Sequence, residues 1–331
     1  MAQISFDTKL IADRLPLLQQ RAHMMRATRS FFDQRGYTEV ETPYAVSTPG
    51  EEVHLRCFKT ELETPDGRHE PRFLHTSPEF AMKRIVAATK LPIYQLARVW
   101  RNGEASNTHA PEFTMLEWYA PYVNLDGLME ETEAFVKALL PERVYREGQW
   151  ISLDAPFERV TVQDAFLRYV GLDILATDGD ADVLAKQAGI RLRTGETWEE
   201  LFFRLLLERI EPRIGREKPT FLTHWPVEQA ALSKKDPTDS RVALRFELYI
   251  GGIELANAFE ELTDSQEQKE RFEKDRAHRL RIHSDQDWPL DEAFLKSLEA
   301  LPPCSGIALG FDRLVMLATG APSIRDVLWL L

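Results

Sequence analysis

Residues 98–119 read RVWRNGEASNTHAPEFTMLEWY, and this stretch decides the fold. Apolar residues alternate before and after a polar loop of Gly, Ser, Asn and Thr, which predicts two strands joined as a hairpin. Such a hairpin can hold a nucleoside triphosphate, because an arginine such as Arg101 neutralises the α-phosphate and an aromatic ring such as Phe113 supplies a face for the base. Taken alone, the pattern also fits an ordinary amphipathic hairpin with charged edges.

The segment resembles motif 2 of the class II aminoacyl-tRNA synthetases, and residues 111–119 (PEFTMLEWY) resemble its lysyl branch. Two further stretches resemble the other motifs of that class. Residues 36–43 (GYTEVETP) are similar to motif 1, in which a helix runs into a strand that ends at a proline. Residues 304–317 (CSGIALGFDRLVML) are similar to motif 3, a Gly-rich strand that enters a helix. Glycines in such a strand let the backbone approach a ligand closely.

Within this class, the chain most resembles the elongation factor P–(R)-β-lysine ligases, which are paralogues of lysyl-tRNA synthetase. Besides motif 2, the resemblance rests on HTSPEFAMKR (75–84), GGIELANAFEELTD (251–264) and CSGIALGFDR (304–313). Ser77, and Ala308 in the middle of the motif 3 glycine triplet, are features of the β-lysine version. The resemblance implies an α+β fold in which an antiparallel sheet is flanked by helices, and a homodimer formed through motif 1.

The local patterns indicate one catalytic domain over residues 1–331, with no anticodon-binding domain. A helix is expected over the first 35 residues, and strands with connecting loops over 36–120. An amphipathic helix is expected at 126–140 and a small helical insertion at about 160–225. Gly251-Gly252 between alternating segments predicts a hairpin. The remaining patterns are insertion helices at 161–170, 180–189 and 197–211, an exit loop at 212–219 and an exposed helix at 264–281. The third insertion helix opens with Thr197 three residues before Glu200, which predicts a capping box.

Composition limits the class of protein and its partners. The 331 residues carry a formal net charge of −12, whereas tight tRNA binding is usually accompanied by a basic surface. The N-terminus has no long apolar run, so neither a signal peptide nor a membrane span is indicated. Cys57 and Cys304 are the only cysteines, which suits a reducing cytoplasm and gives no metal cluster. We therefore expect a cytoplasmic protein whose acceptor has a basic surface, and no tRNA.

The resemblance implies an ATP site and a role for each of its main residues. Arg101 contacts the α-phosphate and the substrate carboxylate, His109 the triphosphate tail, Phe113 the adenine and Arg313 the γ-phosphate. Catalysis is assigned to the two arginines. Further ATP contacts are expected at Asn102, Gly103, Glu104, Glu254, Leu255 and Gly310. Mg²⁺, which prefers oxygen ligands, is expected at Glu254 and Glu261.

A diamino acid carries two ammonium groups, so an acidic pocket is expected. The residues implied for it are Ser77, Pro78, Glu79, Glu117, Tyr119, Glu261 and Ala308, with Glu267 as a further candidate. Moving an amino group from the α- to the β-carbon shifts its position by one bond. Ser77 adds a hydroxyl acceptor and Ala308 adds a methyl group, and either can reshape the pocket for (R)-β-lysine.

Three departures from the lysyl pattern bear on these assignments. Glu104 follows a glycine, whereas relatives have a glutamate directly after the asparagine, so its contact with the adenine amino group is open. Ala110 stands where relatives often have asparagine, which leaves only backbone contacts to ATP. Glu254 and Glu261 are seven residues apart, on opposite faces of a regular strand. They converge only if the strand bends or ends near Ala258.

Three functions remain under consideration. The first is an ATP-dependent ligase that adenylates (R)-β-lysine and transfers it to a lysine ε-amine of elongation factor P. The second is a truncated lysyl-tRNA synthetase that charges tRNA. The third is a non-catalytic synthetase paralogue that acts as a regulatory subunit. The presence of Arg101, Phe113 and Arg313 argues against the third, because a pure binding module does not need them.

Overall fold

The computed structural model describes residues 8–330, which form two compact units. Unit 1 contains the chain up to Val123 and again from Thr263, and unit 2 is Asn124–Leu262. Both units combine helices with mainly antiparallel sheet, so the predicted α+β class is confirmed. That residues 1–331 act as one domain stays a prediction. Among the described residues, no helix is both long and apolar enough to cross a membrane.

The central sheet of unit 1 has the strand order β1-β5-β6-β13. The short β1 (Thr38–Glu39) runs parallel to β5 (Ile93–Trp100), whereas β6 (Glu112–Pro121) pairs antiparallel with both β5 and β13 (Cys304–Gly310). Residues 98–119 are therefore the predicted hairpin. Motif 3 is the predicted strand followed by a helix, since α9 (Phe311–Thr319) begins directly after β13.

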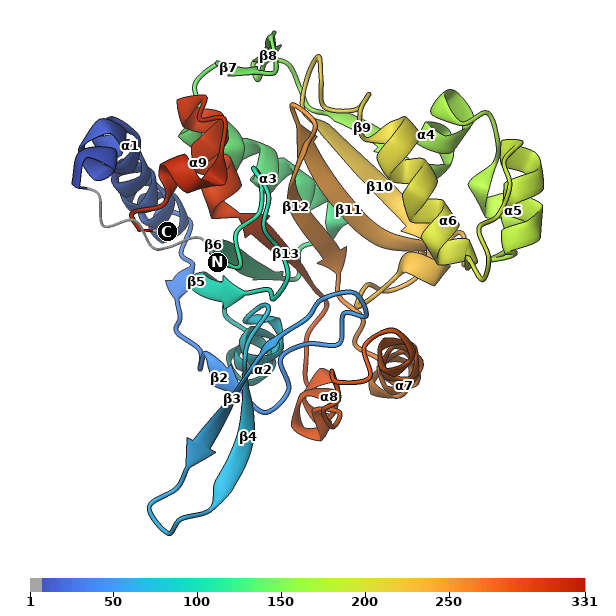
Figure 1. The fold of residues 1–331 in the computed structure, drawn as a ribbon, viewed down its shortest axis with the longest axis horizontal. Coiled ribbons are helices and arrows are strands. Elements are labelled where there is room, and N and C mark those ends of the chain that lie inside the picture. The colour runs from blue at the N-terminus through green and yellow to red at the C-terminus, as the bar shows by residue number, and fades with distance from the viewer. Residues whose placement is uncertain (1–7, 331) are drawn as a thin grey trace. The chain divides into compact units, whose positions relative to one another are not determined.

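Helix α1 (Thr8–Asp33) packs on one face of this sheet and confirms the predicted N-terminal helix from Thr8 onward. Phe32 stacks on Tyr94 of β5 with ring centroids 4.6 Å apart, and both side chains are buried. Gly36 adopts a φ of 75°, as expected for the residue that ends a helix. Figure 1 shows α1 beside α9, and a short 3₁₀ turn, η4 (Ile324–Val327), also contacts both helices.

A smaller sheet and three helices complete unit 1. The sheet has the order β2-β4-β3, and Figure 1 shows its β3–β4 hairpin projecting from the unit. Helix α2 lies within the region interpreted from the sequence as strands and loops, so that interpretation is wrong there. Phe80 of α2 stacks on Phe294 of α8 at 4.2 Å. The bounds are β2 (Ala45–Val46), β3 (Phe58–Glu63), β4 (His69–Leu74), α2 (Glu79–Thr89), α7 (Ser265–Ile282) and α8 (Glu292–Leu298).

The sheet of unit 2 has the order β12-β11-β10-β9, and only the β9–β10 pair is parallel. Gly251 and Gly252, with φ of 61° and 72°, form the predicted hairpin between β11 and β12. Helix α3 confirms the amphipathic helix expected at 126–140. The bounds are α3 (Leu125–Leu139), β7 (Arg143–Arg146), β8 (Gln149–Ser152), β9 (Glu158–Thr161), β10 (Thr220–Pro226), η3 (Val227–Gln229), β11 (Val242–Ile250) and β12 (Ile253–Glu260).

The helical insertion is present in unit 2, with one corrected boundary. Thr197 and Glu200 form the predicted capping box at the start of α6. The insertion ends before Thr220, because 220–226 is a strand of the sheet and not part of the helical segment. Its elements are α4 (Val162–Tyr169), η1 (Ile174–Thr177), α5 (Ala181–Ala188), α6 (Trp198–Leu205) and the π-helical turn η2 (Leu206–Ile210).

Candidate active site

The motif 2 loop leaves the end of β5 and returns to β6. The Arg101 backbone N–H donates to Pro111 O at 2.9 Å, which closes the base of the loop. The Arg101 guanidinium lies 5.3 Å from the centre of the Phe113 ring and 3.9 Å from the Glu104 carboxylate. Within residues 8–330, its buried Nε atom has no hydrogen-bond partner. An arginine that has an unused hydrogen-bond donor and lies beside an aromatic ring is suited to bind an anionic ligand that carries a base.

Two residues expected at the triphosphate tail lie together at the tip of this loop. Arg313 of α9 lies 2.6 Å from His109 Nε2, and its Nε donates to Thr108 O at 3.2 Å. Because arginine can only donate, His109 Nε2 accepts, and the ring hydrogen is on Nδ1, 2.8 Å from Ser106 Oγ. These contacts join the loop tip to the first turn of α9.

A buried ion pair that the sequence did not predict connects α1 with motifs 2 and 3. Arg21 of α1 pairs with Asp312 of α9, and both side chains are almost completely inaccessible to solvent. Arg21 also donates to Thr114 Oγ1 at 2.8 Å, and the Thr114 backbone N–H donates to Asp312 Oδ2 at 2.8 Å. The network fixes the start of α9, and with it Arg313, against β6. The only sequence signal is that Arg21 shares a helix face with buried Leu18, Met24 and Thr28.

Glu117 on β6 is in contact with two other residues that were expected to form an acidic pocket, Ser77 and Tyr119. Its Oε1 accepts a hydrogen bond from Ser77 Oγ at 2.5 Å, and its Oε2 accepts one from Tyr119 OH at 3.1 Å. Ser77 Oγ also accepts from the Glu79 N–H at 3.0 Å. The hydroxyl expected as an acceptor for the substrate thus orients Glu117 and the start of α2. Ala308 pairs directly with Glu117 across the β6–β13 ladder, so the two residues share a face of the sheet.

Electrostatics here favour a protonated Glu117 before a ligand enters, and in that form one of its two oxygens donates to a neighbouring hydroxyl instead of accepting from it. Burial raises the pKa of Glu117 to about 8, and the nearby Glu79 carboxylate adds to this rise. Glu79, which follows Pro78 at the start of α2, accepts from Lys83 Nζ at 2.5 Å, and Lys83 is 1% exposed. An entering ammonium group would stabilise the ionised form of Glu117, so the pocket is suited to a cation.

The other residues expected in unit 1 are distributed as follows. Asn102 N–H donates to Arg56 O at 2.7 Å, and Gly103 has a φ of 89°, both in the motif 2 loop. Gly310 caps α9, where a Cβ atom would lie 3.3 Å from Arg313 Cδ. Glu267 of α7 accepts from Arg271 Nη2 at 2.6 Å.

The residues expected on β12 belong to unit 2, and a bulge there changes their faces. Glu254 pairs with Tyr249 and Ala256 with Leu248, so Leu255 is an extra residue in the ladder. The extra residue reverses the alternation, which places Glu254 on the same face as Asn257. Glu261, four positions beyond Asn257, continues that face. The irregularity in the strand thus lies at Leu255, whose side chain is buried, and not near Ala258.

These two carboxylates offer oxygen ligands of the kind that Mg²⁺ prefers. Burial raises the pKa of the neighbouring Glu247 to about 7, and the Glu254 carboxylate contributes to that rise. Glu254 thus adds negative charge to this face. Among the described residues, no group of three or more His, Cys, Asp or Glu side chains is arranged to hold a metal. A cation here would therefore need further oxygen ligands, such as phosphates.

Comparison with known proteins extends the resemblance to nearly the whole chain. Residues 12–330 match the family described as tRNA synthetases class II (D, K and N). A protein of Proteus mirabilis named elongation factor P–(R)-beta-lysine ligase is 43% identical over 316 residues, which cover 94% of this chain and 93% of that protein. A Salmonella typhi protein of the same name is 42% identical over 322 residues, covering 95% and 94% of the two chains.

Proposed function

The chain belongs to the class II (D, K and N) tRNA synthetase family, and from this premise we propose that it is an ATP-dependent ligase for elongation factor P. It adenylates (R)-β-lysine and transfers it to the ε-amino group of a lysine on the factor. The observation that carries the proposal is the buried Glu117, held by Ser77 and Tyr119 opposite Ala308. Full-length similar proteins carry the corresponding name.

In the first step, a carboxylate oxygen of the amino acid attacks the α-phosphorus of ATP and pyrophosphate leaves. Both reactants are anionic, so the residues that lower the barrier are those that place positive charge where negative charge develops. Arg101 contacts the carboxylate and the α-phosphate, while Phe113 stacks on the adenine. Arg313, held by His109, takes the γ-phosphate. Further ATP contacts come from Asn102, Gly103, Glu104, Leu255 and Gly310.

Glu254 and Glu261 are the residues of this chain that would hold Mg²⁺. When bound, the ion neutralises phosphate charge and orients the triphosphate. Glu254 lies on β12 and Glu261 directly follows that strand on the same face, which supports this assignment because the two carboxylates are not on opposite sides of the sheet.

The acidic pocket recognises the ammonium groups of the diamino acid. Ionised Glu117 accepts from one ammonium group, with Tyr119 completing the wall, and Glu79 serves the other. Ser77 fixes the Glu117 carboxylate and Pro78 starts the helix that carries Glu79. The Ala308 methyl group limits the space opposite Glu117. This disfavours α-lysine, whose α-ammonium group is displaced by one bond from the β-ammonium position of (R)-β-lysine.

In the second step, the neutral ε-amine of the acceptor lysine attacks the acyl carbon of the adenylate. The C–N bond forms, the C–O bond to AMP breaks, and the amine loses one proton to solvent. We place the reaction in the cytoplasm and expect a homodimer formed through motif 1. The net charge of −12 favours a basic protein surface over tRNA as the acceptor.

Amino-acid-dependent ATP–pyrophosphate exchange without tRNA tests this function. We expect the strongest exchange with (R)-β-lysine, weaker exchange with α-lysine and the weakest with (S)-β-lysine. Absence of exchange with every diamino acid would refute adenylation. A preference for α-lysine would retain adenylation and refute the role of Ala308 and Ser77 in selecting the β-isomer.

A further inference from the structure

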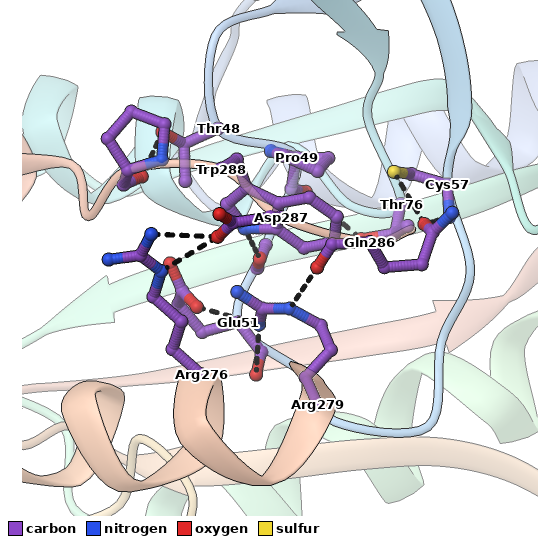
Figure 2. Close-up of polar contacts among 12 residues, drawn as sticks. Thr48, Pro49, Glu51, Cys57, Thr76, Arg276, Arg279, Gln286, Asp287 and Trp288 are labelled. Carbon is purple, nitrogen blue, oxygen red and sulfur yellow. Dashed lines mark hydrogen bonds and ion pairs between the residues drawn. The ribbon is translucent and has the colours of Figure 1, made fainter. Parts of the chain in front are cut away.

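The loop that connects β2 to β3, here called the β2–β3 loop, is held by a buried ion pair with α7. Glu51 in the loop pairs with Arg279 at 2.8 Å, and the two side chains are 2% and 0% exposed. Arg279 Nη1 also donates to Glu51 O at 3.3 Å, and the guanidinium lies 4.0 Å from the centre of the Trp288 ring. Figure 2 shows these contacts within a cluster, here called the Arg279 cluster, made of Glu51, Cys57, Arg279, Gln286 and Trp288.

The Arg279 cluster holds the β2–β3 loop at further points. Trp288 Nε1 donates to Gly50 O at 2.9 Å. Arg279 Nε donates to Gln286 O at 3.1 Å, and the Gln286 side chain accepts from the Cys57 N–H at 3.0 Å (Figure 2). The position of the loop backbone therefore depends on the Arg279 side chain.

The β2–β3 loop in turn contacts Thr76, which precedes α2. Thr76 donates to Pro49 O twice, with its Oγ1 at 3.0 Å and with its backbone N–H at 3.4 Å. Gly50 has a φ of 151°, and a Cβ atom there would lie 2.9 Å from Thr76 Oγ1. Such a close approach requires a glycine, so the loop backbone packs directly against Thr76.

Thr76 connects this loop to the proposed acidic pocket. It is followed by Ser77, whose Oγ lies 2.5 Å from Glu117 Oε1 and accepts from the Glu79 N–H at 3.0 Å. A continuous series of contacts thus runs from Arg279 through the loop to Glu117. A displacement of the loop would move Ser77 and change the orientation of the Glu117 carboxyl group.

We propose that Arg279 is a positioning residue for the proposed acidic pocket. By fixing the β2–β3 loop against Thr76, it fixes Ser77 and, through Ser77, the orientation of Glu117. Arg279 itself does not contact the substrate. The inference rests on the proposed function, in which Glu117 binds an ammonium group of the diamino acid.

The buried ion pair is better suited to fix geometry than to stabilise the fold. Removing two charges from water costs about as much free energy as their attraction provides, so such a pair adds little net stability. Within residues 8–330, Glu51 Oε1 and Arg279 Nη2 are buried without a hydrogen-bond partner, which adds to that cost. The contacts that Arg279 does make are directional, because its planar guanidinium presents its donors in fixed directions.

The test compares Arg279→Met with the wild-type protein in ATP–pyrophosphate exchange. Burial raises the pKa of Glu51 to about 7, so the assay is run at pH 8, where Glu51 of the wild type is mainly ionised. We expect the KM for (R)-β-lysine to rise about tenfold or more, because a displacement of about 1 Å can cost about 10²-fold. The KM for ATP should stay within about twofold, because Phe113 and Arg313 lie outside this series of contacts. Arg279→Lys, which keeps the charge without the planar donors, should recover part of the loss.

Two further variants separate positioning from a general loss of stability. Arg204→Met is the matched control, because it removes an ion pair with Glu196 in unit 2 whose side chains are 15% and 5% exposed. It should lower the melting temperature and leave the KM values unchanged. Thr76→Val removes the hydroxyl that donates to Pro49 O. If Arg279 acts through this contact, the effects of Arg279→Met and Thr76→Val on the KM should not add.

Several outcomes of this assay would overturn the inference. The first is an unchanged KM for (R)-β-lysine in folded Arg279→Met. The second is a full sum of the separate effects of Arg279→Met and Thr76→Val in the double variant. The third is an equal rise of the KM in Arg204→Met, because the effect would then follow from lost stability alone.

Failure of the proposed function is distinguishable from failure of this inference. If the wild-type protein shows no ATP–pyrophosphate exchange, the proposed function fails, and amide hydrogen–deuterium exchange of residues 75–82 tests the inference without any substrate. These amides should exchange at least about tenfold faster in Arg279→Met than in Arg204→Met, because the loop no longer holds the segment. Equal rates in the two variants would overturn the inference.

Discussion

Replacing Glu117 with glutamine removes the charge at the centre of the proposed ammonium pocket and keeps the size of the side chain. Glu117 is 1% exposed and accepts from Ser77 and Tyr119. Glutamine can accept one of these hydrogen bonds, so the fold should survive. An ammonium group that contacts the amide in place of a carboxylate loses about 1.5–3 kcal/mol of binding free energy. The KM for the diamino acid should therefore rise about 10- to 150-fold at pH 8.5.

The pH dependence gives a second readout with a definite sign. Burial raises the pKa of Glu117 from its ordinary value of 4.5 to about 8, so Glu117 in the free protein holds a proton at pH 7. Binding an ammonium group requires the ionised form and releases this proton. The wild-type KM should fall about tenfold per pH unit as the pH rises towards 8 and then level off. Glu117→Gln has no such group, so its KM should stay flat through this range.

The same shift affects stability. Because the folded-state pKa lies above the unfolded one, the folded protein retains a proton between pH 4.5 and 8 that the unfolded chain has lost. Wild-type stability should therefore decline as the pH rises through this window, and Glu117→Gln should decline less. A shift of this size corresponds to at most roughly 4–5 kcal/mol. Urea unfolding at pH 5 and 8.5 measures it.

ATP–pyrophosphate exchange across pH 6.5–8.5 is the deciding assay, with Glu61→Gln as a control that removes an exposed carboxylate. Equal KM values for wild type and Glu117→Gln at pH 8.5 would refute the assignment of Glu117 to the ammonium group. A wild-type KM that does not change with pH would refute the raised pKa as the source of the effect.

Three further changes test other parts of the account. Arg101→Ala should lower the rate of exchange about 10²–10³-fold, because a donor to the developing phosphate charge is lost, and near wild-type turnover of folded protein would count against motif 2. Asp312→Ala should lower the free energy of unfolding in urea by about 3–5 kcal/mol, because it leaves Arg21 buried without its carboxylate. A loss below about 1 kcal/mol would show that the pair is dispensable. Ala308→Gly should shift the ratio of exchange rates towards α-lysine by up to about tenfold, because it removes the methyl group opposite Glu117, and an unchanged ratio would exclude that residue from selectivity.

Local periodicity was sufficient to predict most of the secondary structure. The 98–119 hairpin, the Gly251-Gly252 turn and the capping box at Thr197 depend on residues close together in sequence, and all three are present. Helix α2 was missed because its 11 residues bury only a short stripe, Met82, Lys83, Val86 and Ala87, directly after a proline. The buried Lys83, which pairs with Glu79, interrupts the pattern of apolar residues that indicates an amphipathic helix in a sequence.

Contacts between distant residues could not be predicted in the same way. Arg21 and Asp312 are 291 positions apart, and Glu51 and Arg279 are 228 apart, so no periodicity connects them. The bulge at Leu255 changes the face of Glu254 by the insertion of a single residue, which the strand pattern does not reveal. For the site, the sequence predicted the residue types of the acidic pocket, but not that Ser77 would be used to orient Glu117.

The acceptor is the central claim, and mass spectrometry of elongation factor P tests it most directly. The protein is incubated with ATP, Mg²⁺, (R)-β-lysine, purified factor and lysine tRNA in one reaction. We expect the factor to gain the mass of one β-lysyl group at a single lysine, and acid-gel analysis to show uncharged tRNA. An unmodified factor beside charged tRNA would contradict the account and identify the protein as a truncated lysyl-tRNA synthetase.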